Sequence, residues 1–451
     1  MTDGWYERLG LNEIIGPLKT KGIDIDALVR GMIADQLGEN FSILKASEWI
    51  NRPEILDHYG IESFNEKTLY RTVETVGQNR EKIIFSLQDH VLKLLGAPST
   101  DILLDWTSIG IFGDMAKLAK YGYSRDHQPD ERQLTLGVAQ LAPPLNIPIG
   151  FTIEAGNIND QTHMWNTYGQ VRHLLQERSL VVFDRGANDK KNLDRIGLDK
   201  NDYLTAKKLN ASDDRIYQSF SKDSWECIDA SAGIYALKRT FPSRVNYYFF
   251  SEKLMKEHLR SRRRKVDRLY AEARSIQNSL DKKKKLPKRF RINNPLVDVR
   301  YDYQTKLVEM DEEAAKRLLL EDVIDGREGC FCLTSSRDMP ASEALKIYRG
   351  KDAIEKLFHS LKSEIEIKPV RVWTDDAVYG VLLIGFIAQV MISLTRHFVE
   401  PVKRMSTKFI IASLNYLTVT VVSMENGMKR KVYSNFDKVN RAILAEYLAE
   451  T

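Results

Sequence analysis

A continuous apolar run, Leu180-Val181-Val182-Phe183, ends at the acidic residue Asp184. Such runs are typical of strands buried on both faces in the central sheet of an α/β protein. Before this run, residues 102–106, 134–141 and 149–154 show strand patterns and residues 161–177 show a helical pattern. After it come a helical pattern at 189–196 and a strand pattern at 203–206. Strands that alternate with helices in this way predict an α/β layer architecture with a central sheet.

The rest of the chain divides into further segments. Residues 1–98 show apolar side chains at helical spacing and form either a region that binds DNA ends or a plain helical packing domain. Residues 99–207 and 336–400 hold the two parts of the expected α/β domain, and residues 401–451 are expected to be helical. Residues 208–335 interrupt that domain with antiparallel strand patterns and a long helix beginning at Glu252.

Positive charge is concentrated within this interruption. Residues 253–291 contain 16 Lys or Arg and 4 Asp or Glu, a net charge of +12, whereas the whole chain carries +5 and the remainder therefore −7. We expect a basic arm that binds a polyanion, with Arg260, Arg263 and Arg264 among its contacts. The alternative is a solvated helix with a flexible Lys-rich end.

The cysteines and the apolar stretches bear on the cellular compartment. Cys227, Cys330 and Cys332 cannot form an even set of disulfides and lack metal-finger spacing, so free thiols are expected. The N-terminus lacks the basic-then-apolar pattern of a signal peptide. The longest apolar stretch, Gly380 to Leu394, is shorter than the ~18 residues of a membrane span, which favours a buried core helix. We expect a cytoplasmic protein.

Two aspartates stand where a catalytic site could form. Asp105 and Asp184 each end an apolar run of strand type. Ligand crevices of open α/β sheets occur at the carboxyl ends of strands, and Gly110 and Gly186 would keep the backbone near each acid uncrowded. The alternative is that both aspartates are ordinary turn or helix-cap residues.

A third acid, Glu355, lies on a predicted helix with Tyr348, Lys351 and Lys362. At about 100° per residue these four side chains fall within an arc of roughly 60°. Apolar residues on a neighbouring arc would dock the helix: Ile354, Leu357, Phe358, Leu361 and Ile365. The helix therefore either carries a metal-binding acid among phosphate-binding groups or is an ordinary amphipathic surface helix with Glu–Lys pairs.

Taken together, these segments resemble the DDE transposases of bacterial insertion sequences. The segments are Leu103-Leu104-Asp105-Trp106-Thr107, Val182-Phe183-Asp184-Arg185-Gly186, the Tyr348–Lys351–Glu355–Lys362 set and the stretch 122–130. The particular likeness is to the group with a Y-(2)-R-(3)-E-(6)-K signature. The resemblance implies a ribonuclease H-like catalytic domain whose insertion is residues 208–335.

The resemblance also implies the chemistry. Asp105, Asp184 and Glu355 would be the catalytic residues and the ligands of two Mg²⁺ ions, for which Mn²⁺ could substitute, with Asp105 bridging. Two ions about 3.5–4 Å apart can activate an attacking oxygen and stabilise a leaving oxygen, and Mg²⁺ prefers oxygen ligands.

The remaining members of the signature would contact DNA phosphates near the cleaved end. Tyr348 and Lys362 match it residue for residue. Lys351 stands where Arg is usual, so the charge is retained but the bidentate guanidinium fork is lost.

The function implied is that of a transposase that binds the terminal inverted repeats of an insertion sequence. It would cleave double-stranded DNA at the element ends and join the 3′-OH ends to target DNA, as a homodimer on DNA. One alternative is a ribonuclease H-like nuclease without strand transfer, and another is an inactive transposase-derived DNA-binding protein. A glycoside hydrolase with two carboxylates is disfavoured by the basic arm.

Overall fold

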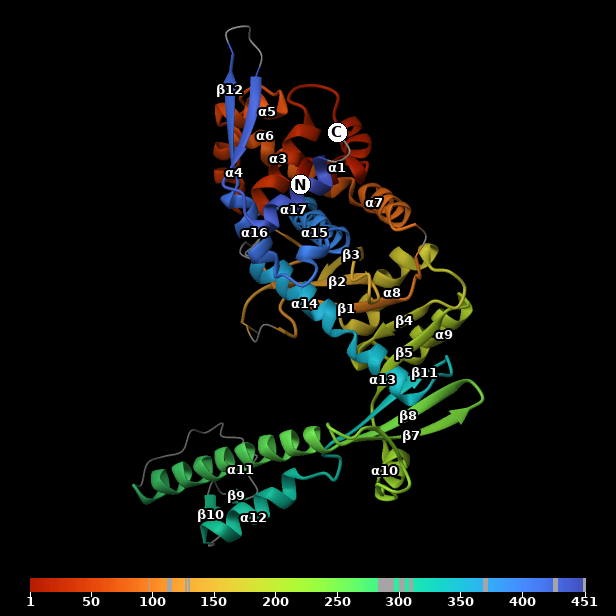
Figure 1. Cartoon of the computed structure of the whole chain (residues 1–451). Helices are drawn as coiled ribbons and strands as arrows, with labels where there is room; N and C mark the ends of the chain where they lie inside the picture. Colours follow the sequence, from red (N-terminus) through yellow and green to blue (C-terminus); the bar gives the residue numbers. More distant parts are fainter. Residues whose placement is uncertain are drawn as a thin grey trace. The chain divides into compact units, whose positions relative to one another are not determined.

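The protein is described by a computed structural model over residues 1–96, 98–111, 116–125, 128, 130–282, 296–299, 305–307, 311–367, 372–424 and 429–448. Its chain forms two compact units, one of Met1–Thr205 with Ile347–Thr451 and the other of Ala206–Lys346 (Figure 1). Parts of two predicted features lie outside the described residues: 126, 127 and 129 in the stretch 122–130, and 283–291 in the basic arm.

The first unit is built on a mixed sheet with the strand order β3-β2-β1-β4-β5. Its strands are β1 (Ile102–Gly110), β2 (Gln133–Leu141), β3 (Pro148–Ala155), β4 (Leu180–Phe183) and β5 (Asp202–Lys207). β1, β2 and β3 pair antiparallel, whereas β4 pairs parallel with both β1 and β5. This mixed sheet confirms the predicted α/β class.

Helices pack against this sheet. α8 (Asp160–Val171) lies against β2 and β3, and α9 (Lys190–Leu198) joins β4 to β5 (Figure 1). Every residue of β2 and β4 is buried, as expected for strands covered on both faces. The side chains of Leu136, Val138 and Phe183 are among those that form the core.

The N-terminal region is helical, as predicted. Its helices are α1 (Thr2–Arg8), α2 (Leu11–Ile15), α3 (Ile25–Leu37), α4 (Ile43–Ile50), α5 (Pro53–Tyr59), α6 (Glu66–Gln78) and α7 (Arg80–Leu94), with a 3₁₀ turn at Gly16–Leu18. Three of these helices, α3, α6 and α7, pack against α15 (Asp375–Phe398) (Figure 1).

Two glycines allow α6 and α15 to approach closely. A Cβ on Gly380 would lie 1.9 Å from the Val73 carbonyl oxygen, and a Cβ on Gly77 would lie 1.7 Å from that of Asp376. Any larger residue would therefore push the two helix backbones apart. α15 is the one described helix long and apolar enough to span a membrane, but 89% of its apolar window is buried inside the protein. It is a core helix, as its sequence predicted.

The C-terminal part differs from the all-helical expectation for residues 401–451. Between α16 (Thr407–Tyr416) and α17 (Lys438–Leu448) the chain forms an antiparallel hairpin of β12 (Thr418–Ser423) and β13 (Lys429–Ser434). Residues 418–423 read Thr-Val-Thr-Val-Val-Ser. β-branched residues lose rotamer freedom in a helix and favour extended backbone, which explains the hairpin.

The second unit combines antiparallel strands with a long helix. β11 (Cys330–Ser335), β8 (Arg244–Ser251), β7 (Ile234–Phe241) and β6 (Glu226–Asp229) pair in that order. The other elements are α10 (Ala211–Gln218), α11 (Glu252–Asp281), α12 (Glu312–Val323) and the two-stranded pair β9 (Val297–Val299) and β10 (Thr305–Leu307). Its three cysteines are free thiols: Cys332 is buried, Cys330 is partly buried and Cys227 is exposed.

Candidate active site

Asp105 and Asp184 lie on neighbouring parallel strands of the first unit. Ile102 pairs with Val181 and Leu103 with Val182, and continuing this register by two residues sets Asp105 beside Asp184. Asp184 directly follows β4, as expected. Asp105 does not end its strand, because β1 continues to Gly110 through four buried residues paired with β2. The two aspartates nevertheless lie side by side on adjacent parallel segments, at the point where β4 ends.

The environment of Asp105 disfavours its charged form. Burial, followed by the charge of Asp184, raises the pKa of Asp105 to about 6, although Lys351 and the backbone N–H of Trp106 act in the opposite direction. That N–H donates to Asp105 Oδ1 at 2.9 Å. A carboxyl group with a raised pKa, beside a second acid and a buried cation, is typical of functional sites.

Two residues of the predicted helix reach Asp184. The Tyr348 hydroxyl donates to Asp184 Oδ1 at 3.0 Å, and the Lys351 ammonium forms an ion pair with the same carboxylate. Lys351 is 3% exposed. Burial and the Asp184 charge raise the pKa of Tyr348 above its ordinary value, so this phenol stays protonated as a donor. The structure thus joins four of the predicted site residues: Asp105, Asp184, Tyr348 and Lys351.

The four signature residues do not share one continuous helix. α13 (Ala341–Arg349) ends before Gly350, and α14 (Asp352–His359) begins after Lys351. At the junction the backbone N–H of Lys351 donates to the Tyr348 carbonyl, three residues back. Residues three apart eclipse in such a 3₁₀-like turn, which explains why Tyr348 and Lys351 both face Asp184. The expectation of a single 60° arc is therefore wrong.

Glu355 and Lys362 lie farther along this segment. Glu355 is exposed on the first turn of α14, and α14 packs against β1. Lys362 is partly buried in a π-helical segment, Ser360–Glu364. The extra residue per turn there shifts its direction relative to Glu355. The structure therefore does not align Lys362 with Glu355 as regular helical spacing predicted.

The two aspartates are chemically suited to bind a hard divalent cation. Asp105 and Asp184 offer carboxylate oxygens, the ligands that Mg²⁺ prefers. Among the described residues, however, no group of three or more His, Cys, Asp or Glu side chains is arranged to hold a metal ion. Glu355 thus stands apart from the two aspartates, one of which is paired with the Lys351 ammonium.

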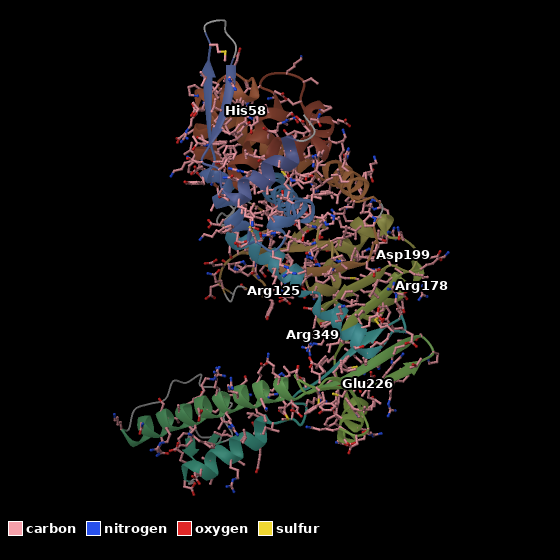
Figure 2. The ribbon with its side chains drawn as sticks, in the orientation of Figure 1. His58, Arg125, Arg178, Asp199, Glu226 and Arg349 are labelled. Carbon is pink, nitrogen blue, oxygen red and sulfur yellow. The ribbon has the colours of Figure 1, made fainter. Side chains whose placement is uncertain are left out.

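Arg125 is a site residue that the sequence did not single out. It lies in the segment between β1 and β2 (Figure 2), forms an ion pair with Asp160, and its charge lowers the pKa of Asp105. Arg125, Asp160 and Gly186 line a pocket of about 460 Å³. A Cβ on Gly186 would lie 2.7 Å from Asp160 Oδ2, so a larger residue there would displace the Asp160 carboxylate. The sequence did carry a signal for Arg125, because this residue lies in the stretch 122–130, one of the segments that resemble the family.

Trp106 and His163 are structural. Trp106 is 2% exposed, and its Nε1 donates to Thr167 Oγ1 at 3.0 Å. His163 is fully buried, with Nε2 3.0 Å from Thr152 Oγ1, and burial lowers its pKa to about 3. Trp106 therefore packs beside its strand and is not available to stack on a base.

The described part of the basic arm is α11 in the second unit. Val266, Ala273 and Ile276 pack in a cluster with residues of α12. Arg260, Arg263 and Arg264 are exposed, and their spacing of three and four residues gathers them on one side of the helix. Arg262 differs, because its Nη2 lies 3.3 Å from Asp325 Oδ2 and its Nε lies 3.5 Å from Glu328 Oε1.

The segment that carries the site matches a known protein family. The family profile described as Transposase DDE domain matches residues 96–391, more than half of the chain. Among solved structures, the cryo-EM structure of the piggyBac transposase synaptic complex with hairpin DNA is similar over 92% of this chain and 76% of that chain, at 9% sequence identity and a TM-score of 0.42. A TM-score of this size does not establish a shared fold. No curated protein matches the sequence.

Proposed function

The chain belongs to the transposase DDE domain family, and we propose that it is an insertion-sequence transposase of the Y-(2)-R-(3)-E-(6)-K group. It would bind the terminal inverted repeats, cleave DNA at the element ends and join the 3′-OH ends to target DNA. The proposal includes a homodimer on double-stranded DNA in the cytoplasm. The strand order β3-β2-β1-β4-β5 supports the ribonuclease H-like catalytic fold that the family resemblance implies.

The observation that carries the proposal is that Asp105 and Asp184 lie side by side on the adjacent strands β1 and β4, at the point where β4 ends. Burial and the neighbouring Asp184 charge raise the pKa of Asp105. A site that gathers negative charge in this way is suited to hold cations beside a phosphodiester. When bound by Asp105, Asp184 and Glu355, two Mg²⁺ or Mn²⁺ ions would supply Lewis acidity for phosphoryl transfer.

The other residues of the site would position the DNA and the acids. The Tyr348 hydroxyl holds one oxygen of Asp184, which fixes the orientation of that carboxylate. Lys351 supplies a buried positive charge that partly compensates the negative charges of Asp105 and Asp184. Lys362 and the exposed Arg260, Arg263 and Arg264 would contact phosphates, which adds affinity without sequence readout.

The test is cleavage of labelled duplex DNA that carries the ends of the element, by the full chain with Mg²⁺ or with Ca²⁺. Glu355→Gln should abolish cleavage and joining while the melting temperature is unchanged, because Glu355 is exposed. Asp352→Asn is the matched control, since Asp352 is an exposed carboxylate three residues earlier on the same helix and forms an ion pair with Lys356. It should cleave as the unchanged protein does.

The outcomes separate the alternatives. Full activity of Glu355→Gln, or cutting without any divalent metal, contradicts the mechanism. Cleavage without joining would identify a nuclease that shares the fold. Binding without cleavage by the unchanged protein would identify an inactive DNA-binding relative. The separation of Glu355 from the two aspartates among the described residues is the observation that favours this alternative.

A further inference from the structure

A second cavity lies in the first unit, away from the paired aspartates. Its volume is about 730 Å³, and it is formed by the turn after β2, α14, the C-terminal half of α15 and residues 403–406. On α14 it is lined by Ala353, Lys356, Leu357 and His359. Among the described residues that line it, none belongs to the candidate active site, so the cavity is distinct from that site.

Two buried amides in this cavity have an unpaired oxygen. Gln140 and Gln389 are each 1% exposed, both line the cavity, and Oε1 of each has no hydrogen-bond partner. The Nε2 of Gln389 donates to Ser393 Oγ at 3.2 Å. Rotating that amide by 180° would leave its nitrogen unpaired instead. Unpaired buried polar groups are rare because they cost free energy, so these two amides point to a polar ligand.

Positive charge gathers at the rim of the same cavity. Lys356, Lys403 and Arg404 line it and are exposed. Lys356 and Lys403 pair with Asp352 and Glu400 in exposed ion pairs, which are weak and can exchange for another anion.

The walls and the deeper charges complete the cavity. Apolar side chains, among them Leu145 and Met405, form the walls. The partly buried guanidinium of Arg396 donates to the Met405 carbonyl at 3.0 Å. Among the described residues that line the cavity, Glu364 is the one carboxylate, so an anion is favoured at the rim rather than beside Glu364.

We propose that this cavity binds a nucleoside phosphate. The base would lie between the apolar walls, with its N–H donors directed at the amide oxygens of Gln140 and Gln389. The phosphate would lie at the rim against Lys403 and Arg404. A volume of this size suits a ligand of that class. The nucleotide is either free or an unpaired nucleotide at the end of a DNA strand, since both present the same chemistry.

The site is separate from Asp105 and Asp184, so its test does not depend on DNA cleavage. Isothermal titration of the full chain would use dAMP, dCMP, dGMP and dTMP, and also deoxyadenosine and inorganic phosphate. Gln389→Met keeps the side-chain length and removes the unpaired amide. Because the buried amide oxygen lacks a partner, its removal offsets the loss of the hydrogen bond to Ser393, and the melting temperature of Gln389→Met without ligand should be about unchanged. Nucleotide affinity should fall roughly tenfold.

The rim is tested separately. Arg404→Ala should weaken binding of the nucleotide but not of deoxyadenosine. Arg71→Ala, at an exposed arginine on α6, is the matched control and should leave both affinities unchanged. Equal binding of inorganic phosphate and of all nucleotides would overturn the proposal, because the base would then contribute nothing.

Two further titrations distinguish the sources. A duplex with one unpaired terminal nucleotide is compared with a blunt duplex of the same sequence. Binding of mononucleotides that Gln389→Met weakens roughly tenfold supports a free nucleotide. If mononucleotides do not bind, but the duplex with the unpaired end binds more tightly than the blunt duplex and Gln389→Met reduces that preference, the ligand is a nucleotide of DNA. Absence of both, or binding that Gln389→Met leaves unchanged, overturns the proposal.

Discussion

The ammonium of Lys351 forms an ion pair with the carboxylate of Asp184. Lys351 is almost completely buried, whereas the side chain of Asp184 is 50% exposed, so the lysine approaches from inside the protein and leaves the outer side of the carboxylate accessible. The same ammonium lowers the pKa of Asp105. One cation therefore compensates two acids.

Replacement of Lys351 by Met should change the pH dependence of DNA cleavage. An opposite charge within about 4–6 Å lowers a carboxyl pKa by about 1–3. Without it, the pKa of Asp105 should rise above its present value of about 6. The acid limb of the pH–rate profile should therefore move to higher pH, and cleavage at pH 7 should fall roughly tenfold. Cleavage rates of labelled duplex from pH 5.5 to 9 measure this.

Lys351→Arg is the control for that experiment, because it keeps the charge. Its profile should lie close to that of the unchanged protein even if its rate differs, since guanidinium and ammonium geometry differ. A Lys351→Met profile that coincides with the unchanged one would show that this cation does not govern Asp105.

Much of the first unit could be predicted because its signals are local. The run from Leu180 to Phe183 indicates a buried strand by composition alone, and Asp184 follows it in the structure. Helical spacing likewise predicted the N-terminal helices and α15. The hairpin in residues 418–434 was missed, although its β-branched residues carried a local signal for strand.

The geometry of the site was less predictable because it depends on contacts distant in sequence. Tyr348 and Asp184 are separated by 164 residues, and the turn at Gly350 lets both Tyr348 and Lys351 reach the acid. Regular helical spacing cannot show such an interruption, although Gly is a poor helix former. Arg125 acts through charge on Asp105, an effect that becomes visible only once β1 and its following segment are placed.

Gly380→Ala should strongly destabilise the first unit. The new methyl group would meet the Val73 carbonyl at 1.9 Å, and separating two packed helices costs about 1–3 kcal/mol or more. Gly169→Ala is the matched control, since Gly169 lies within α8 with nothing within 4 Å of the new Cβ. Ala there should stabilise by about 0.5–1 kcal/mol. Thermal unfolding followed by circular dichroism should show the two shifts with opposite signs.

Replacing Arg260, Arg263 and Arg264 together by Ala should weaken DNA binding and make it less dependent on the salt concentration. If each contacts one phosphate, the slope of log affinity against log salt should become shallower by about 3. Fluorescence anisotropy of a labelled duplex at several salt concentrations measures the slope. The triple Lys variant preserves charge and should retain the slope. An unchanged slope in the Ala variant would assign α11 to the solvated-helix alternative.

Asp35→Asn should stabilise the protein at alkaline pH and not at acidic pH. Asp35 is 4% exposed on α3, and burial raises its pKa from the ordinary 3.8 to about 7 despite a hydrogen bond from the Phe41 backbone. The folded state therefore binds a proton more tightly than the unfolded state. Stability is lost as the pH rises from about 4 through about 7, and the loss amounts to at most about 4 kcal/mol.

Asn removes this titration and can still accept the Phe41 N–H, which lies 3.2 Å from Asp35 Oδ2. The unfolding midpoints of the two proteins should coincide near pH 4, where Asp35 is protonated, and separate in favour of Asn between pH 5 and 8. Chemical denaturation at pH 4, 6 and 8 measures the difference. A constant difference across this range would mean that Asp35 keeps its charge when buried, which would require a cation near its unpaired Oδ1.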